Sequence, residues 1–367
     1  MTSETPPAAA SAAADGLSDA VPIPPAEPDL WQRLRSAYRL RWKRRRLLWR
    51  ALRKRRQLRP VADRTGDIRP DTILAMATLR NEMLRLPHFL DHYRRLGVGH
   101  FLFIDNASTD GTGDYLAAQP DVSLWHTDAS YRLSRFGVDW LTWLAMRHAH
   151  GHWLLTLDAD EILIYPHWQT RPLAALTEWL DDRGIRSFGA MMLDMYPRGR
   201  LDAQPYRPGD DPFETLNWFD SGNYMIRRQE PMGNLWIQGG ARARVFFAAQ
   251  PRRAPTLNKV PLVRWNRRYA YVNSTHALLP KALNRVYDQG GGEALSGLLL
   301  HSKFLNVVVE KSREEKARKQ HFNNSALYDA YYDRLIENPD LWCATSTRYR
   351  GWRHLEAVGL MSRGLWS

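Results

Sequence analysis

The sequence is poor in cysteine and contains no long hydrophobic run. Cys343 is the only cysteine in 367 residues, so no intramolecular disulfide can form, as is usual in a reducing compartment. No apolar stretch reaches the ~18 residues that a membrane-spanning helix needs. The first residues also lack the basic-then-apolar order of a secretory signal. We therefore expect a cytoplasmic protein without a membrane span.

Acidic residues are almost missing from residues 29–60. This segment holds fourteen Lys or Arg and one acid, Asp29, so its formal charge of +13 equals that of the whole chain. The remainder of the chain is neutral in sum. The hydrophobic content of 44% and aromatic content of 11% of the whole chain are typical of a folded protein. The sequence thus predicts a near-neutral folded body that carries a basic appendage.

The N-terminal sixty residues divide into two segments. Residues 1–28 consist mainly of Ala, Pro, Ser and acids, which predicts a disordered tail. Residues 29–60 have no Pro or Gly before Pro60, which predicts a basic amphipathic helix. Arginines fill most of its surface. Near one face, interrupted by Arg45, lie Trp31, Leu34, Tyr38, Trp42, Trp49 and Leu52.

Three interpretations suit this helix. An anionic membrane surface would take the rings at the level of the lipid headgroups. Nucleic acid is a rival, because Arg and aromatic residues also bind phosphates and bases. A third possibility is a solvated helix that packs its aromatic stripe on the body. The stripe favours a membrane over duplex DNA, where rings have little to contact.

From Asp71 onward, short apolar runs alternate with helical stretches. Strands are expected at 72–78, 100–105, 122–125, 153–157 and 187–193, helices at 82–96 and 136–148, further short strands at 239–247, 260–265 and 270–276, and a charged helical stretch at 301–322. This alternation predicts an α/β fold with a doubly wound, mostly parallel sheet. We expect the main domain at 70–280 and a C-terminal helical extension at 281–367.

Three carboxylates follow the fourth expected strand, in WLLTLDADEILIY. Acidic side chains are almost never buried unless they are paired or bind a metal. Asp158 and Asp160 lie on the same side of an extended backbone, whereas Glu161 lies on the other and would support the loop. Oxygen ligands at the carboxyl end of a strand suit Mg²⁺ or Mn²⁺ shared with a phosphate. The alternative is a strand-to-loop junction with solvated acids.

Two further motifs follow other expected strands. In FIDNASTDGT (103–112), Asp105 is placed to bond a ribose hydroxyl or a base N–H, while the residues after it fit a capping turn. In TLRNE (78–82), Arg80 or Asn81 would reach a phosphate or base, or Asn81 would cap the next helix. Because the carboxyl ends of parallel strands share one sheet edge, all three motifs are expected to lie there.

Together, TLRNE, IDNASTDGT and LDADE resemble the GT-A-type glycosyltransferases of the family 2 superfamily, in particular a bacterial branch in which RNE opens the domain and LDADE carries the D-x-D motif. The resemblance covers about residues 72–165 and continues more loosely to about His321. It implies a GT-A, Rossmann-like fold and inverting sugar transfer from a nucleotide-sugar donor to a glycan or lipid-linked acceptor, in surface polysaccharide synthesis. It also implies that Asp158 and Asp160 contact Mn²⁺ or Mg²⁺ and the donor diphosphate, and that Asp105 contacts the nucleoside.

Other functional residues are less well defined by the resemblance. Many family members carry the catalytic base in a later Glu-Asp pair, which has no convincing counterpart here. Asp194 and Asp220 are candidates for the base or are structural loop acids. His276 and His301 would complete the metal shell, as a late histidine does in several GT-A enzymes, or are structural histidines. Arg242 lies in an expected glycine-containing loop, where it would approach the donor or face solvent beside a β-bulge.

Two other functions remain open. A nucleotidyl- or phosphotransferase would use the same acids, and its release of pyrophosphate instead of a nucleoside diphosphate would distinguish it. A non-catalytic nucleic-acid-binding protein with a basic arm is disfavoured, because contacts confined to one helix give little sequence readout. We therefore expect a metal-dependent glycosyltransferase that residues 31–60 hold peripherally on the cytoplasmic face of a bacterial plasma membrane.

Overall fold

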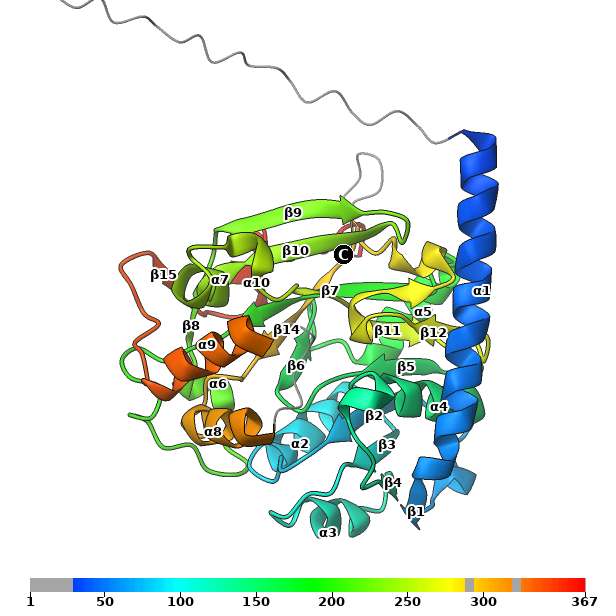
Figure 1. The fold of residues 1–367 in the computed structure, drawn as a ribbon, viewed down its shortest axis with the longest axis horizontal. Coiled ribbons are helices and arrows are strands. Elements are labelled where there is room, and N and C mark those ends of the chain that lie inside the picture. The colour runs from blue at the N-terminus through cyan, green and yellow to red at the C-terminus, as the bar shows by residue number, and fades with distance from the viewer. Residues whose placement is uncertain (1–28, 288–293, 319–324, 367) are drawn as a thin grey trace, which may run out of the picture.

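A computed structural model of the chain describes residues 29–287, 294–318 and 325–366. The segment 1–28, for which the sequence predicts a disordered tail, lies outside these residues, as do residues 319–322 of the expected charged helix. Figure 1 shows a body built around one central sheet, with a long helix standing along one side. The sheet and the helices that cover it determine where the candidate site lies.

The central sheet has nine strands. Their spatial order is β1 (Arg59–Ala62), β4 (Val122–His126), β3 (His100–Asp105), β2 (Leu74–Leu79), β5 (Trp153–Thr156), β11 (Asn258–Arg264), β7 (Ser187–Asp194), β14 (Gly297–His301) and β6 (Glu161–Ile164). Strands β1, β11 and β6 run antiparallel to their neighbours, so six of the nine strands run in one direction. The mostly parallel α/β sheet that the sequence predicts is confirmed.

The order β4-β3-β2-β5 matches the 3-2-1-4 order that begins the Rossmann fold. After β2, the chain places β3 and then β4 on one side of that strand, and β5 pairs with β2 on its other side. In open α/β sheets, ligands bind outside the carboxyl ends of the strands at such a switch point. The fold therefore predicts a ligand-binding site at the carboxyl ends of β2 and β5.

Helices cover both faces of this sheet. They are α2 (Leu86–Leu96), α3 (Thr112–Ala117) and α5 (Leu173–Asp182) on one face, and α4 (Val138–His148) on the other. Side chains alternate along β2 as the strand period requires. Ala75 and Ala77 belong to the core beneath α2, whereas Leu74 and Met76 belong to the core beneath α4. The sheet is therefore buried on both faces in this region.

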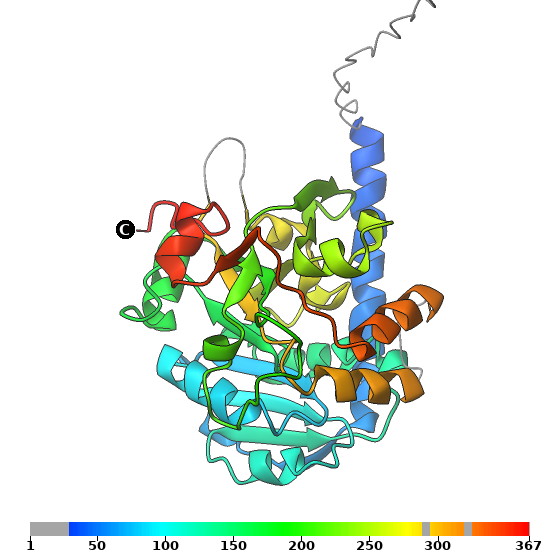
Figure 2. The ribbon, with the colours of Figure 1, turned by 90° about the vertical axis from the view of Figure 1, so that its left-hand side faces the viewer.

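Smaller elements surround the second half of the sheet. They are α6 (Pro212–Thr215), β8 (Trp218–Asp220) paired with β15 (Ser346–Arg348), the hairpin β9 (Tyr224–Gln229) and β10 (Asn234–Gly239), α7 (Gly240–Phe246), β12 (Ala270–Tyr271) paired with β13 (Leu278–Leu279), α8 (Val308–Arg318), α9 (Ser325–Ile336) and α10 (Trp352–Ala357). Figures 1 and 2 show α8 and α9 side by side at one end of the body.

Several element predictions are wrong. Most of the expected strand 239–247 is helix α7 (Gly240–Phe246), because the backbone turns at Gly239 and Gly240. Gly240 has φ +66°, and a Cβ on Gly239 would lie 2.1 Å from the carbonyl oxygen of Asn223. Of the expected strand 270–276, only β12 is extended. The expected helical extension 281–367 also supplies β14 to the central sheet.

The basic helix α1 (Leu30–Lys54) packs on α4 and β12. Its buried residues are Leu40, Leu47 and Ala51. The aromatic stripe is exposed, so the alternative in which that stripe packs on the body is wrong. No helix among the described residues is long and apolar enough to cross a membrane.

Candidate functional site

The site is built on the turn 157–160, which carries Asp158 and Asp160. This turn joins β5 to β6, which lie on opposite sides of β11, β7 and β14 in the sheet order. The turn therefore passes the ends of β11, β7 and β14, which lie between β5 and β6 in the sheet. Asp158 meets Lys259 near the start of β11, and Asp160 meets His301 at the end of β14. One short turn thus presents two carboxylates to two different partners.

Asp158 and Glu161 share the buried Lys259 ammonium group. Lys259 Nζ lies 2.8 Å from Asp158 Oδ2 and 2.5 Å from Glu161 Oε1. Glu161 is buried and also accepts the backbone N–H of Asp158, so it supports the turn as predicted. Burial raises the pKa of Glu161 to about 7 against the opposing effect of Lys259. The Asp158 side chain, by contrast, is 52% exposed and is available to a ligand.

Asp160 begins a chain of paired groups that runs into the core. His301 Nε2 lies 3.1 Å from Asp160 Oδ2, and His301 Nδ1 lies 2.7 Å from Asp194 Oδ1. Arg242 Nε donates to the other oxygen of Asp194 at 2.7 Å. Burial alone would raise the pKa of Asp194, but Arg242 and His301 outweigh it and lower that pKa to about 2. Asp194 is therefore a permanent anion that orients His301.

Asp160 and His301 fit a divalent cation. When Nδ1 of His301 donates its proton to Asp194, the lone pair of Nε2 faces Asp160, and such carboxylate–histidine pairs are typical of metal ligands. Within the described ranges, no three His, Cys, Asp or Glu side chains gather as a metal-binding group. The chain thus offers two ligands here. This suits Mg²⁺ or Mn²⁺, because hard cations keep other positions for water and substrate phosphates.

His276 lies on the Lys259 side of the site and not beside Asp160. Its Nδ1 donates to the carbonyl oxygen of Asn258 at 2.6 Å, which leaves Nε2 for another partner. Burial and the nearby Lys259 lower the pKa of His276 to about 4, so its ring is neutral. Of the two late histidines, His301 is therefore the one that the fold brings to a carboxylate of the D-x-D pair.

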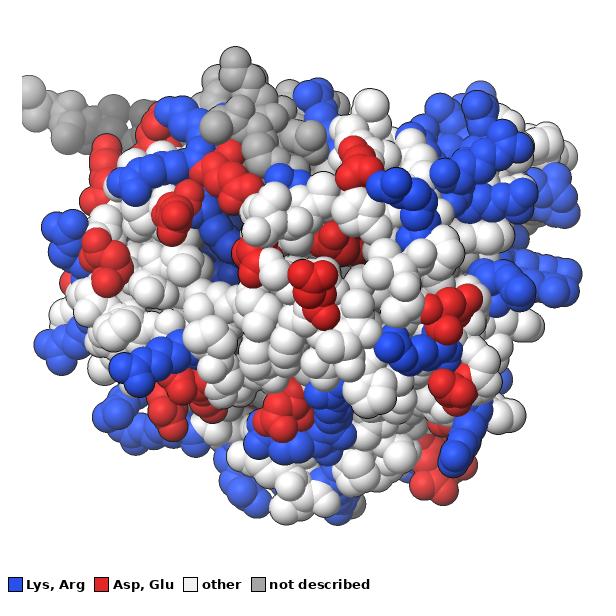
Figure 3. Space-filling model, turned by 90° about the horizontal axis from the view of Figure 1, so that it is seen from below, with Lys and Arg blue, Asp and Glu red and all other residues white. Residues whose placement is uncertain are grey.

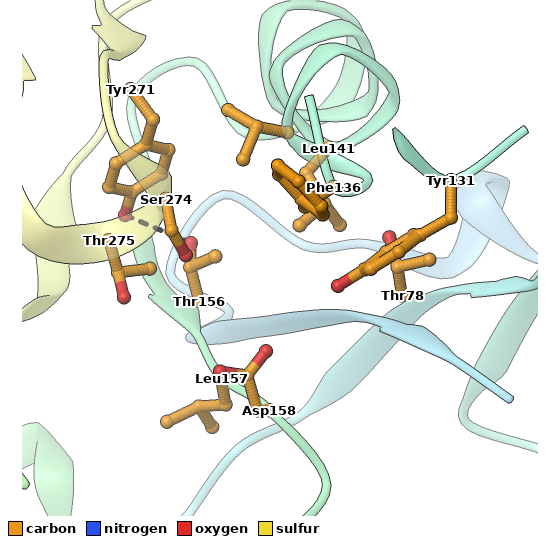
Figure 4. Close-up of a pocket in the computed structure, with 11 residues that line it drawn as sticks. Thr78, Tyr131, Phe136, Leu141, Thr156, Leu157, Asp158, Tyr271, Ser274 and Thr275 are labelled. Carbon is orange, nitrogen blue, oxygen red and sulfur yellow. Dashed lines mark hydrogen bonds between the residues drawn. The ribbon is translucent and has the colours of Figure 1, made fainter. Parts of the chain in front are cut away.

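A pocket lies at the switch point between β2 and β5 (Figure 4). Its lining consists of Thr78, Tyr131, Phe136, Val138, Leu141, Thr156, Leu157, Asp158, Tyr271, Ser274 and Thr275. Three aromatic rings, those of Tyr131, Phe136 and Tyr271, thus lie beside a set of hydroxyl groups, and Asp158 is the one ionised lining residue. Such a surface suits a flat polar ring or a sugar, because it offers both a stacking face and hydrogen-bonding groups.

The loops that follow β2 and β3 are hydrogen-bonded to each other. Arg80 donates to the carbonyl oxygens of Asn106 and Ala107, both at 2.8 Å. The backbone N–H of Asn81 donates to Ser108 Oγ at 3.0 Å, and Asn81 Oδ1 accepts the backbone N–H of Thr109 at 2.8 Å. In this structure, the polar residues of both motifs join the two strand ends. Donor contacts by Arg80 and Asn81 remain predictions.

Asp105 is occupied by its own turn. Only 4% of the residue is exposed. Its carboxylate accepts the backbone N–H of Ser108 at 3.2 Å and lies 3.0 Å from His126 Nδ1. Burial alone would lower the pKa of His126, but Asp128 and Asp105 outweigh it and raise that pKa. These contacts explain Asp105 as a residue that fixes the loop after β3, and its contact with a nucleoside stays a prediction.

The two base candidates are both held in ion pairs. Asp220 accepts Arg244 Nε at 2.8 Å and Nη2 at 2.9 Å, and it also accepts the Tyr196 hydroxyl. Asp194 is paired as described above. The pKa of Asp194 is lowered to about 2, so this carboxylate is a weak base. Arg242 is buried in helix α7 against Asp194, so both the expected loop and its solvent-facing alternative are wrong, and its contact with the donor stays a prediction.

Three important residues were missed by the sequence analysis. Lys259 opens the apolar run KVPLVRW, and a cation at the start of a buried strand was the signal that an acidic partner lies nearby. Tyr131 and Phe136 lie in the segment before α4, where no local pattern marks them as pocket residues. Their place follows from the backbone there, because Phe136 has φ +58° and Gly137 has φ +76°.

Comparisons with known proteins are limited to solved structures of low similarity. No family model and no curated protein matches the chain. One similar structure is a putative glucose-1-phosphate thymidylyltransferase from Bacillus anthracis in complex with a sucrose, with 10% identity, a TM-score of 0.33, and coverage of 70% of this chain and 98% of that chain. Another is 4-diphosphocytidyl-2C-methyl-D-erythritol synthase, with 13% identity, a TM-score of 0.28, and coverage of 74% and 100%. Similarity at this level carries no argument about function.

Proposed function

We propose that the protein is a metal-dependent glycosyltransferase that uses a nucleotide-sugar donor. The observation that carries this proposal is the turn 157–160 at the topological switch point. It directs Asp158 into the pocket and Asp160 onto His301. The order of the three motifs along the sheet edge supports the same class of enzyme.

Each residue of the site has a proposed role in binding the metal or the donor. Asp160 and His301 would hold Mg²⁺ or Mn²⁺, which stabilises negative charge on a departing diphosphate. Asp194 keeps the His301 ring oriented through the 2.7 Å contact with Nδ1. The rings of Tyr131 and Phe136 would stack on the base or sugar of the donor. Lys259 holds Asp158 in place at the wall of the pocket.

For the acceptor we propose a glycan or a lipid-linked sugar, at the cytoplasmic face of a membrane, in surface polysaccharide synthesis. The support is the separation of charge along the chain. Residues 29–60 carry a formal charge of +13, and the remaining chain is neutral in sum. A basic segment joined to a neutral body concentrates electrostatic attraction in one place, as expected of a peripheral enzyme whose substrate lies at an anionic surface.

A nucleotidyltransferase is the second candidate, and one observation favours it. Transfer to an acceptor hydroxyl needs a general base, whereas a phosphate acceptor is already an anion. Asp194 is ion-paired with Arg242 and its pKa is lowered to about 2, so it is not suited to take up a proton, and the Asp220 carboxylate is held by Arg244. The product decides between the two reactions. Release of a nucleoside diphosphate indicates glycosyl transfer, and release of pyrophosphate indicates nucleotidyl transfer.

The proposal is tested by thermal shift with a panel of nucleotide-sugars in the presence of Mn²⁺. At least one donor is expected to raise the unfolding temperature only when Mn²⁺ is present. Asp160→Asn should remove this shift, because it removes a charged ligand without changing the size of the side chain. Asp91→Asn is the matched control, since that carboxylate is 64% exposed on α2. A panel without any metal-dependent shift, or an equal shift in Asp160→Asn, would contradict the proposal.

A further inference from the structure

The two faces of helix α1 differ in what they contact. Each residue advances the helix by about 100°, so Trp31, Leu34, Tyr38, Trp42, Trp49 and Leu52 fall within an arc of about 80°. Leu40, Leu47 and Ala51, which pack on the body, are centred about 180° away. The exposed fractions of the six stripe residues are therefore high, from 38% for Leu52 to 79% for Trp31. We call these six residues the outward stripe.

Exposed cations border the outward stripe. Arg35, Arg39, Arg46 and Arg53 lie along one border, and Arg41 lies along the other. Arg45 lies within the stripe, with its guanidinium 5.2 Å from the centre of the Trp42 ring, and Arg53 lies 4.6 Å from the Trp49 ring. Helix α1 itself contains no acidic residue. Figure 3 shows Lys and Arg gathered at the edge where Figure 1 places α1.

We propose that the outward stripe and its bordering arginines lie on an anionic lipid bilayer. Rings of this kind sit at the headgroup level, and flexible arginines extend from the same face toward lipid phosphates. The attraction is worth about fivefold in partitioning for each cation near the surface. Duplex DNA would pair with the arginines but would leave four exposed rings in water. A bilayer accounts for both the rings and the charge.

Contacts on the opposite face keep α1 attached to the body during this binding. Arg50 pairs with the buried Asp139 at 2.9 Å, and Trp140 Nε1 donates to Gln57 just beyond the helix at 2.9 Å. Both partners belong to α4, whose residues Val138 and Leu141 line the pocket. The helix therefore does not have to leave the body to reach lipid. The bilayer is expected to hold the catalytic domain in one orientation.

This inference rests on the peripheral location proposed above and not on the reaction. Sedimentation of the full chain with vesicles tests it. The vesicles contain phosphatidylcholine alone, or two parts phosphatidylcholine to one part phosphatidylglycerol. The ring variant replaces Trp31, Tyr38, Trp42 and Trp49 with Ser. The charge variant replaces Arg35, Arg39, Arg46 and Arg53 with Gln. The matched control replaces the exposed Arg252, Arg253, Arg267 and Arg268 with Gln.

The wild-type chain is expected to sediment with the anionic vesicles and not with the neutral ones. The charge variant should bind at least about 100-fold more weakly, and the ring variant about tenfold more weakly or worse. The control should stay within about threefold of wild type, since its arginines lie off α1. The metal-dependent donor shift should persist in all variants, which separates failure of this inference from failure of the proposed reaction.

Three results would overturn the inference. One is a wild-type chain that ignores anionic vesicles. Another is a control that loses as much binding as the charge variant, which would indicate a general effect of net charge. The third is tighter binding to a 20-base-pair DNA duplex than to vesicles, unchanged in the ring variant, which would identify nucleic acid as the partner. Equal unfolding temperatures of the variants serve as the folding check.

Discussion

Replacing Lys259 with Met tests how the acidic turn is held together. Only 4% of the Lys259 side chain and 1% of the Glu161 side chain are exposed, and their charged atoms lie 2.5 Å apart. At an effective dielectric constant of about 20, the attraction between Lys259 and Glu161 at 2.5 Å is roughly 7 kcal/mol. Much of this offsets the cost of removing the charges from water. The variant loses the attraction but leaves Glu161 buried.

Lys259→Met should therefore lower the free energy of unfolding by about 3–5 kcal/mol. Adding Glu161→Gln should recover about 2–3 kcal/mol at pH 7, because without the ammonium group Glu161 must take up a proton to stay buried, whereas Gln is neutral without one. Asp158 needs no such rescue, since its side chain is 52% exposed and water solvates it. Urea unfolding of the two single variants and the double variant measures the coupling.

The control is Arg95→Met on α2. Arg95 pairs with Asp91, and both side chains are 64% exposed. This change should cost less than about 1 kcal/mol, as is usual for exposed pairs. The reasoning is refuted if Lys259→Met costs no more than the control. It is also refuted if Glu161→Gln gives no recovery in the Lys259→Met background, because Glu161 would then not be the group that the ammonium stabilises.

Three further predictions concern the pocket, the core and the metal ligands. Gly137→Ala should lower the free energy of unfolding, measured in urea, by about 1–3 kcal/mol, because φ is +76° and the new Cβ would lie 2.6 Å from Thr78 Oγ1. The control Gly66→Ala should change little, since no atom lies within 4 Å of its new Cβ. Equal effects of the two changes would contradict the argument. Burial lowers the pKa of His92 to about 3, below its unfolded value of about 6.5, so the unfolded chain binds a proton that the folded chain excludes and stability falls as pH falls through this range. Wild type should therefore lose about 1.5–2 kcal/mol more than His92→Gln between pH 6.5 and pH 5, and equal losses in urea titrations would refute this. Asp194→Asn removes the carboxylate that orients His301 and should weaken the metal affinity of the donor shift by about 10–100-fold, and an Mn²⁺ titration with unchanged affinity would show that Asp194 has no such role.

Local pattern alone determined much of this protein. The alternation of apolar runs and helical stretches predicts the strands β2, β3, β4, β5 and β7 and their connecting helices, because side-chain periodicity is a property of neighbouring residues. The same logic predicts that α1 is basic and amphipathic. It also separates Glu161 from Asp158 and Asp160, since adjacent residues of an extended chain face opposite ways. The structure shows Glu161 under the turn.

Only the tertiary structure decided the partners of these residues. Asp158 meets Lys259 across 101 positions and Asp160 meets His301 across 141, and no local periodicity encodes contacts at such separations. The residues around Arg242 were expected to be extended, but two glycines turn the chain into α7 and bury that guanidinium against Asp194. For α1, the sequence suggested only the aromatic stripe as a face that could pack on the body. The body covers Leu40 and Leu47 and leaves the outward stripe exposed, because α4 and β12 pack against the aliphatic face of the helix.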